Sequence, residues 1–116
     1  MIRHGETEAN ASRIMAGWTD SPLTANGEKQ AEKAIAAFKS VKIKPTAVVH
    51  SHLSRARDTA AIINSYLRLP VYELEDLAEL HAGEWEGVSY DICYQPLIDR
   101  TDPPGGETYE IFCNRV

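Results

Sequence analysis

Apolar side chains recur every three or four residues in two stretches of this 116-residue chain, and this spacing predicts two amphipathic helices. The first begins after Thr24, a residue type that favours the N-cap position, and ends in a lysine-rich turn that suits the helix dipole. Its apolar face consists of Ala31, Ala34, Ile35, Phe38 and Val41. The second helix is predicted over residues 53–67. Its apolar face consists of Ala56, Ala60, Ile63 and Leu67.

Short apolar runs beside these helices predict strands. Residues 46–50 and 71–74 each follow a proline, and the first run is typical of a buried parallel strand because it is rich in β-branched side chains. Met1 and Ile2 are interpreted as the end of a further strand. Alternating strands and helices are the signature of βαβ units, so we expect an α/β fold with a parallel sheet.

The pattern is less regular in the second half of the chain and around the first motif. Short helices are predicted over residues 8–15 and 90–95, and another is predicted from Glu107 onward. Prolines and glycines at 102–106 predict a loop between the last two.

The composition is that of one ordinary globular domain, with 43% hydrophobic and 25% charged residues. No apolar run reaches membrane-spanning length, and no secretory leader precedes the first motif. Cys93 and Cys113 form no CxxC pair. We therefore expect reduced thiols that serve as small hydrophobic side chains, in a cytoplasmic protein with no membrane partner.

Charge is distributed unevenly along the chain. The net charge of −5 argues against nucleic acid as a partner. Residues 1–60 hold nine Lys/Arg against six Asp/Glu, which gives +3, whereas residues 61–116 hold three against eleven, which gives −8. A small anionic ligand therefore meets a favourable field only in the first half.

The first half also holds the most informative motif, Arg3-His4-Gly5-Glu6-Thr7. Arginine offers a planar fork of donors that matches phosphate oxygens, and a neutral imidazole keeps a lone pair with which it can attack phosphorus. Gly5 lets the backbone approach a bound anion closely. The motif predicts a phosphate-handling site, although an Arg-His pair also arises by chance and a single histidine is often only structural.

A second candidate cluster lies where the strand predicted at 46–50 gives way to the helix predicted at 53–67. Helix N-termini bind anions through free N–H groups and the helix dipole. Arg55 or Arg57, one turn into this helix, could add a second guanidinium to a phosphate held by Arg3.

Four ordered blocks covering nearly the whole chain resemble the histidine phosphatase, or phosphoglycerate-mutase-like, superfamily. The blocks are Arg3-His4-Gly5-Glu6-Thr7 with Asn10, Gly17-Trp18-Thr19-Asp20-Ser21-Pro22-Leu23-Thr24 and Gly27; Ser51-x-Leu53-x-Arg55-Ala56 with Thr59-Ala60; Leu77-x-Glu79-x-x-x-Gly83-x-Trp85-Glu86-Gly87; and Pro104-Gly105-Gly106-Glu107-Thr108. The resemblance implies a three-layer sandwich around a mostly parallel sheet. Within the family, the blocks are similar to those of α-ribazole phosphatases and broad-specificity phosphatases.

The resemblance also implies a phosphomonoester phosphatase and a role for particular residues. His4 is implied to be the nucleophile that becomes phosphohistidine, and Glu79 the proton donor to the leaving oxygen. The implied phosphate-binding residues are Arg3, Asn10 and Arg55, and the implied substrate contacts are Ala16 and Gly17. No metal and no cofactor are expected, because guanidiniums supply the positive charge that phosphoryl transfer requires. The expected partner is a small phosphorylated metabolite, and a homodimer is compatible with these features.

One feature of the family is missing, a second histidine in a downstream His-Gly pair that completes the phosphate pocket. The last histidine here is His81, and the only His-Gly pair is His4-Gly5. We therefore expect residues 1–116 to be a single histidine phosphatase domain that is incomplete, truncated at the start of its first strand and on its C-terminal side. Whether this chain is active alone stays open.

Three other interpretations are considered. A cofactor-dependent phosphoglycerate mutase would share the site, but classical mutases resemble one another in following the glutamate with Arg-His-Tyr-Gly, whereas Glu79 precedes Leu80-His81-Ala82. Mutases also carry a later arginine pair, whereas this chain has only the isolated Arg100 and Arg115. A truncated, non-catalytic phosphate-binding or interaction domain is the second. Zinc at His50-x-His52 is the third, and it is disfavoured because no matching Cys or His cluster accompanies the pair.

Overall fold

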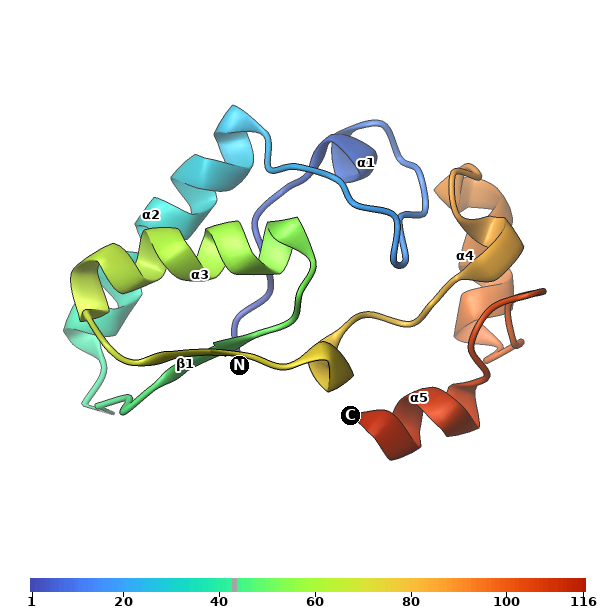
Figure 1. Ribbon diagram of the computed structural model, residues 1–116. Coiled ribbons are helices and arrows are strands. Elements are labelled where there is room, and N and C mark those ends of the chain that lie inside the picture. The colour runs from blue at the N-terminus through green and yellow to red at the C-terminus, as the bar shows by residue number, and fades with distance from the viewer. Residues whose placement is uncertain (43) are drawn as a thin grey trace.

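The computed structural model describes residues 1–42 and 44–116 and has the α/β class with a parallel sheet that the sequence predicts (Figure 1). Its helices and strands are α1 (Glu8–Ala11), α2 (Ala25–Ser40), β1 (Val48–His50), α3 (Ser54–Leu67), β2 (Val71–Glu73), α4 (Tyr90–Ile98) and α5 (Tyr109–Arg115). Two single 3₁₀ turns, η1 (Glu75–Leu77) and η2 (Gly83–Trp85), lie between β2 and α4.

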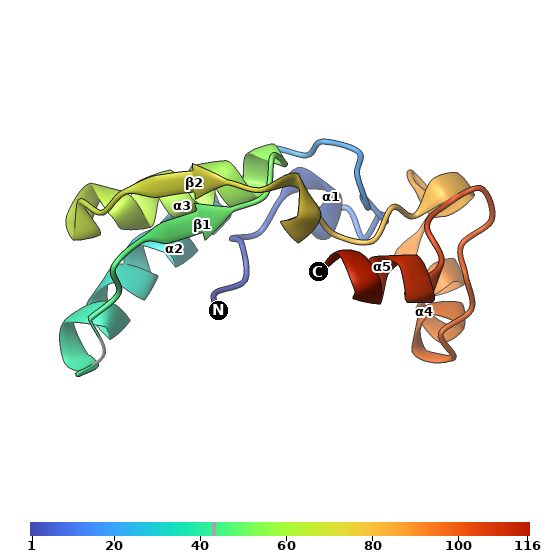
Figure 2. The ribbon, with the colours of Figure 1, turned by 60° about the horizontal axis from the view of Figure 1, so that its bottom comes forward.

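The two predicted amphipathic helices, α2 and α3, form within a residue or two of their expected bounds. The Thr24 hydroxyl accepts a hydrogen bond from the Gly27 N–H at 3.0 Å, so the predicted N-cap of α2 is confirmed. Helix α3 ends at Arg68, whose φ of 54° is a left-handed C-cap conformation. The two helices pack against each other, as both ribbon views show (Figures 1 and 2).

A βαβ unit organises the middle of the chain. Strand β1 pairs in parallel with β2, with Val48 opposite Val71 and Val49 opposite Tyr72. Helix α3 connects the two strands and packs against β1 (Figure 2). Two parallel strands need a crossover connection of this kind, because a tight turn reverses the direction of the chain and would make the strands antiparallel.

Two expectations about strands were wrong in detail. Residues 1–6 join no strand among the described residues, and Met1 and Ile2 are exposed, because no described backbone offers them a ladder of hydrogen bonds. Strand β1 is also not fully buried. Val49 and Tyr72 share one face of the sheet, where they are 46% and 57% exposed. Helix α3 covers only the other face in the described part of the chain.

The C-terminal part of the chain carries α4, the predicted loop at 102–106 and α5. Helix α1 is shorter than predicted, because Arg13 takes a left-handed conformation with φ of 55°. Both cysteines are free thiols that lie in helices, as expected: Cys93 is buried in α4 and belongs to the apolar core, whereas Cys113 is exposed on α5. Of the helices in the described residues, none combines the length and apolar character that crossing a bilayer would need.

The buried apolar side chains are contributed by several elements and by the segment that connects β2 to α4. They are Ala31, Leu53, Ile63, Ala78, Leu80, Ala82 and Cys93. Three of these alternate along residues 78–82, as expected for extended chain with every second side chain in the core.

Candidate active site

The turn that carries His4 is fixed between the N-terminal ends of α2 and α3. The Gly5 N–H donates to the Thr59 hydroxyl on α3 at 3.0 Å, and that hydroxyl donates to the Arg55 carbonyl at 2.7 Å. On the other side, Gly5 packs so closely against Gly27 of α2 that a Cβ atom at either glycine would overlap the backbone of the facing segment. This contact explains why the resemblance blocks carry glycine at both positions.

The His4 imidazole is held in one tautomer. Its Nδ1 lies 2.7 Å from the Gly5 carbonyl oxygen, and a carbonyl can only accept, so Nδ1 carries the proton and Nε2 keeps the lone pair. Burial lowers the pKa of His4 below its ordinary value. The Gly5 carbonyl opposes this shift, while the positive charges of Arg55 and Arg3 lower the pKa further. The net result favours the neutral, nucleophilic imidazole.

His4 opens onto a cavity of about 470 Å³. The lining residues are Arg3, His4, Glu6, Asn10, Arg13, Ile14, Gln30 and Tyr90. Three of the sequence-predicted site residues, Arg3, His4 and Asn10, therefore meet at one hollow. The Asn10 side-chain oxygen accepts from the Thr7 N–H at 3.1 Å and caps α1, which leaves the amide NH₂ as the group that can donate to a ligand.

Arg55 acts on this site from the buried side. Its guanidinium donates to the Gly17 carbonyl at 2.6 Å and to the Thr19 carbonyl at 3.3 Å, and the residue is only 4% exposed. Its charge lowers the pKa of His4. Arg57, the other candidate, pairs instead with its exposed neighbour Asp58 at 2.8 Å. Residues two apart on a helix point in different directions, so only one of the two arginines can face the His4 turn.

The two predicted substrate contacts lie in different surroundings. The Gly17 carbonyl is engaged by Arg55 at 2.6 Å. Ala16 lines a second hollow of about 250 Å³, which shares the lining residue Ile14 with the cavity that His4 lines. A substrate that touches both Ala16 and His4 would therefore have to bridge the two hollows.

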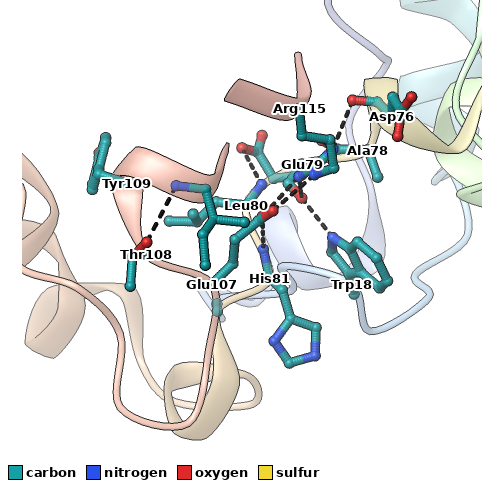
Figure 3. Close-up of polar contacts among 12 residues, drawn as sticks. Trp18, Asp76, Ala78, Glu79, Leu80, His81, Glu107, Thr108, Tyr109 and Arg115 are labelled. Atoms are coloured by element: carbon teal, nitrogen blue, oxygen red, sulfur yellow. Dashed lines mark hydrogen bonds and ion pairs between the residues drawn. The ribbon is translucent and has the colours of Figure 1, made fainter. Parts of the chain in front are cut away.

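Glu79 is exposed, and its carboxylate accepts from the Leu80 N–H at 2.9 Å (Figure 3). Its negative charge acts on His4 by raising the pKa of the imidazole, against the larger lowering by burial and by the arginines. The Glu79 carbonyl accepts from the Trp18 indole N–H at 2.6 Å. The backbone of Glu79 is thus tied to the loop that Arg55 holds.

Three residues that support the site carried no assigned role in the sequence. Trp18 meets the rings of His52 and His81 edge-on, with centroids 5.4 and 5.3 Å apart. Glu86 accepts hydrogen bonds from both the 17–19 loop and Ala82. Trp18 and Glu86 lie within the sequence blocks that resemble the family, and this was the only indication in the sequence that they support the site. Arg115, described below, is an isolated arginine and gave none.

The Glu86 carboxylate joins the loop at residues 17–19 to the segment near Ala82. Burial alone would raise the pKa of Glu86, but hydrogen bonds from the Thr19 hydroxyl and from the N–H groups of Trp18, Ala82 and Thr19 hold it below its ordinary value. The ionised carboxylate is therefore the form that the fold favours.

Metal ligands do not gather in the part of the chain that the structure describes: no group of three or more His, Cys, Asp or Glu side chains is placed to hold an ion. His50, one of the two histidines considered for zinc, directs its Nδ1 to the Ser51 carbonyl at 2.7 Å.

The structure is that of an α/β protein in which the His4 turn is fixed between two helices, beside a cavity lined by Arg3 and Asn10. The chain belongs to the histidine phosphatase superfamily (branch 1), whose sequence profile matches residues 1–116.

Relatives with curated names include phosphatases and mutases. The chain is 38% identical to the uncharacterized phosphatase PhoE of Bacillus subtilis, over all of this chain and 58% of that protein. It is 38% identical to the adenosylcobalamin/alpha-ribazole phosphatase of Escherichia coli, over all of this chain and 61% of that protein. It is 46% identical to the probable phosphoglycerate mutase GpmB of Serratia proteamaculans, over 89% of this chain and 43% of that protein. The chain thus spans between 43% and 61% of the length of these relatives.

Solved structures share the fold. Bacillus stearothermophilus YhfR matches with a TM-score of 0.81 and 34% identity, over 97% of this chain and 60% of that one. Mycobacterial hydrolase 1 matches with a TM-score of 0.85 and 31% identity, over 97% of this chain and 58% of that one.

Proposed function

We propose that the protein carrying this chain hydrolyses small phosphomonoesters through a phosphohistidine at His4. The observation that carries the proposal is the state of His4, whose Nδ1 is bonded to the Gly5 carbonyl at 2.7 Å and whose pKa is lowered. Its Nε2 lone pair is thereby available for attack on phosphorus. The names of the phosphatases among the relatives support the same reaction.

In the proposed reaction, Nε2 attacks phosphorus and the bond from phosphorus to the ester oxygen breaks. Arg3, which lines the cavity, neutralises the charge on the equatorial oxygens, and Asn10 adds a donor. Arg55 adds its positive charge from the buried side of the site. In the substrate complex, a protonated Glu79 gives its proton to the departing oxygen. Water then attacks the phosphohistidine, the bond from phosphorus to nitrogen breaks, and a proton from this water returns to Glu79.

A phosphatase is favoured over a mutase by the environment of Arg115, one of the two downstream arginines. A mutase needs arginines for the substrate carboxylate, and Arg115 is instead engaged by Glu107 at 2.7 Å and by backbone carbonyls. We propose a small phosphorylated metabolite as substrate. A cytoplasmic location and a dimeric state stay predictions.

The test is to trap the intermediate. The protein is mixed with a ³²P-labelled phosphomonoester, quenched in base, and examined for protein-bound label that acid removes. His4→Ala should abolish the label. His50→Ala is a matched control, because the Nδ1 of His50 makes the same 2.7 Å contact with the carbonyl of the following residue, Ser51.

The same experiment separates the alternatives. Label that leaves as inorganic phosphate supports the phosphatase, whereas label that appears on another hydroxyl of the substrate identifies a mutase. Undiminished labelling of His4→Ala would refute the nucleophile. Phosphate binding without any labelling would identify the non-catalytic alternative.

A further inference from the structure

The candidate acid Glu79 lies in residues 76–81, which we call the Glu79 segment. The segment begins at the end of the 3₁₀ turn η1 and continues outside any helix or strand. The Ala78 and Leu80 side chains enter the core, with exposures of 1% and 7%. Backbone carbonyls need hydrogen-bond donors, and in the described residues this segment pairs with no strand. Side chains supply donors for the carbonyls of Asp76, Ala78 and Glu79 instead.

Arg115 of α5 supplies them. Its Nη1 donates to the carbonyls of Asp76 at 2.7 Å and Ala78 at 3.0 Å, and its Nη2 donates to the carbonyl of Glu79 at 3.3 Å (Figure 3). The guanidinium also lies 5.8 Å from the centroid of the Trp18 ring. Trp18 donates to the same Glu79 carbonyl, so this carbonyl has two donors.

Glu107 holds Arg115 in place and continues the contact along the segment. Its two carboxylate oxygens accept from Nε at 2.8 Å and from Nη2 at 2.7 Å, which is the bidentate geometry of strong Arg–carboxylate pairs. The Arg115 and Glu107 side chains are only 15% and 9% exposed. Glu107 Oε2 also accepts from the His81 N–H at 3.3 Å, and the Glu107 N–H donates to the His81 carbonyl at 2.9 Å.

The donor count of Arg115 excludes a role in binding substrate. A guanidinium has five N–H groups. Arg115 makes five hydrogen bonds, two to Glu107 and three to carbonyls of the Glu79 segment. None is left for a ligand.

We propose that the Arg115–Glu107 pair positions Glu79 for proton transfer to the leaving group, which makes Arg115 and Glu107 positioning residues of the reaction. This inference rests on the proposed function, in which Glu79 is the acid. The pair fixes the backbone on both sides of Glu79, from Asp76 to His81, and so limits the directions that its carboxylate can take. Displacement of a reacting group by about 1 Å can cost about 10²-fold in rate.

The test measures the rate of His4 phosphorylation in a single turnover, with an alkyl phosphate and with p-nitrophenyl phosphate. An alkoxide needs a proton to leave, whereas p-nitrophenolate does not. Arg115→Ala should slow the alkyl phosphate about 10–100-fold and p-nitrophenyl phosphate less than threefold. Arg115→Lys and Glu107→Gln should show the same selectivity with smaller losses, and they carry the test if Arg115→Ala does not fold.

Two comparisons separate positioning from general stability. In a protein that already carries Glu79→Gln, Arg115→Lys should cause no further selective loss, because the acid is gone. Arg57→Ala, which breaks the exposed pair with Asp58, should leave both rates unchanged. Equal losses on the two substrates, or a selective loss that persists beside Glu79→Gln, would overturn the inference.

A measurement that does not depend on catalysis distinguishes failure of this inference from failure of the proposed function. Amide hydrogen exchange at His81 should be faster in Arg115→Lys than in the wild type, while exchange within α2 stays the same. Unchanged exchange at His81 overturns the Arg115–Glu107 contact itself. A wild-type protein that forms no phosphohistidine refutes the proposed function, and with it the purpose assigned to the pair.

Discussion

Glu86 gives the sharpest test of how the site is held together. Its Oε1 accepts from the N–H groups of Trp18 at 2.8 Å and Ala82 at 3.1 Å. Its Oε2 accepts from the Thr19 N–H at 2.8 Å and from the Thr19 hydroxyl. Through these bonds, one carboxylate fixes the loop whose carbonyls receive the buried Arg55. Substitution of Glu86 should therefore lower stability and activity together.

The magnitude follows from the number of bonds and their exposure. A hydrogen bond to a charged group contributes about 1.5–3 kcal/mol, but water can replace part of it at the exposed bonds of Glu86. We expect Glu86→Ala to lower the free energy of unfolding by about 2–4 kcal/mol, and Glu86→Gln, which keeps one acceptor, by about 1–2 kcal/mol. Such losses are a large fraction of the stability of a typical domain.

The loss should depend on pH with a definite sign. The folded protein lowers the pKa of Glu86, so the carboxylate stabilises the fold at every pH above the ordinary glutamate value, about 4.3. This contribution is lost as the pH falls through the lower pKa of the folded state. The stability difference between the wild type and Glu86→Gln should therefore be full at pH 7 and shrink below about pH 4.3.

The assay is urea unfolding followed by circular dichroism at several pH values, together with kcat/KM at pH 7. Glu84→Gln is the matched control: Glu84 lies on the 3₁₀ turn η2, which Glu86 directly follows, and its exposed side chain makes no hydrogen bond within the described residues. It should be close to wild type. Equal destabilisation by the Glu84 and Glu86 substitutions, or a Glu86→Gln loss that is the same at pH 3.5 and pH 7, would refute this account.

Three further predictions concern the pH dependence of activity, the stability of α3 and the need for a metal. The fall of kcat/KM at acid pH, which reports protonation of His4, should have its midpoint below the ordinary histidine pKa of about 6.5. Arg3→Gln should move this midpoint to higher pH, because the charge of Arg3 helps to lower the pKa of His4. A midpoint that does not move would contradict this. Asp20→Ala should lower the free energy of unfolding, measured in urea, by about 0.5–2 kcal/mol. The reason is that the Asp20 carboxylate accepts from the Ser54 N–H at 3.0 Å at the start of α3. The control Asp99→Ala, on the exposed end of α4, should lower it less. Phosphatase activity should survive EDTA, because arginines supply the positive charge at phosphorus; a loss that added zinc or magnesium reverses would reveal a metal site.

The sequence alone determined the parts of this protein that depend on local order. Helices α2 and α3 follow from apolar spacing, and the Thr24 cap follows from residue type, because a helix is formed by groups three and four residues apart. The parallel pairing of β1 with β2 follows from the helix between them. The motif around His4 follows from adjacency, since arginine, histidine and glycine are neighbours in the chain.

Which distant groups meet depends on how the segments pack in three dimensions. The choice between Arg55 and Arg57 depended on the face that α3 turns toward the 17–19 loop. The roles of Glu86 and Arg115 depended on N–H and carbonyl groups contributed by segments about 36 to 68 residues away. A single charged residue belongs to no periodic sequence pattern, so the sequence does not indicate which group it contacts. Its partner is a polar group that packing has left without a hydrogen-bond donor or acceptor. Such groups can be identified only when the packed arrangement of the segments is known.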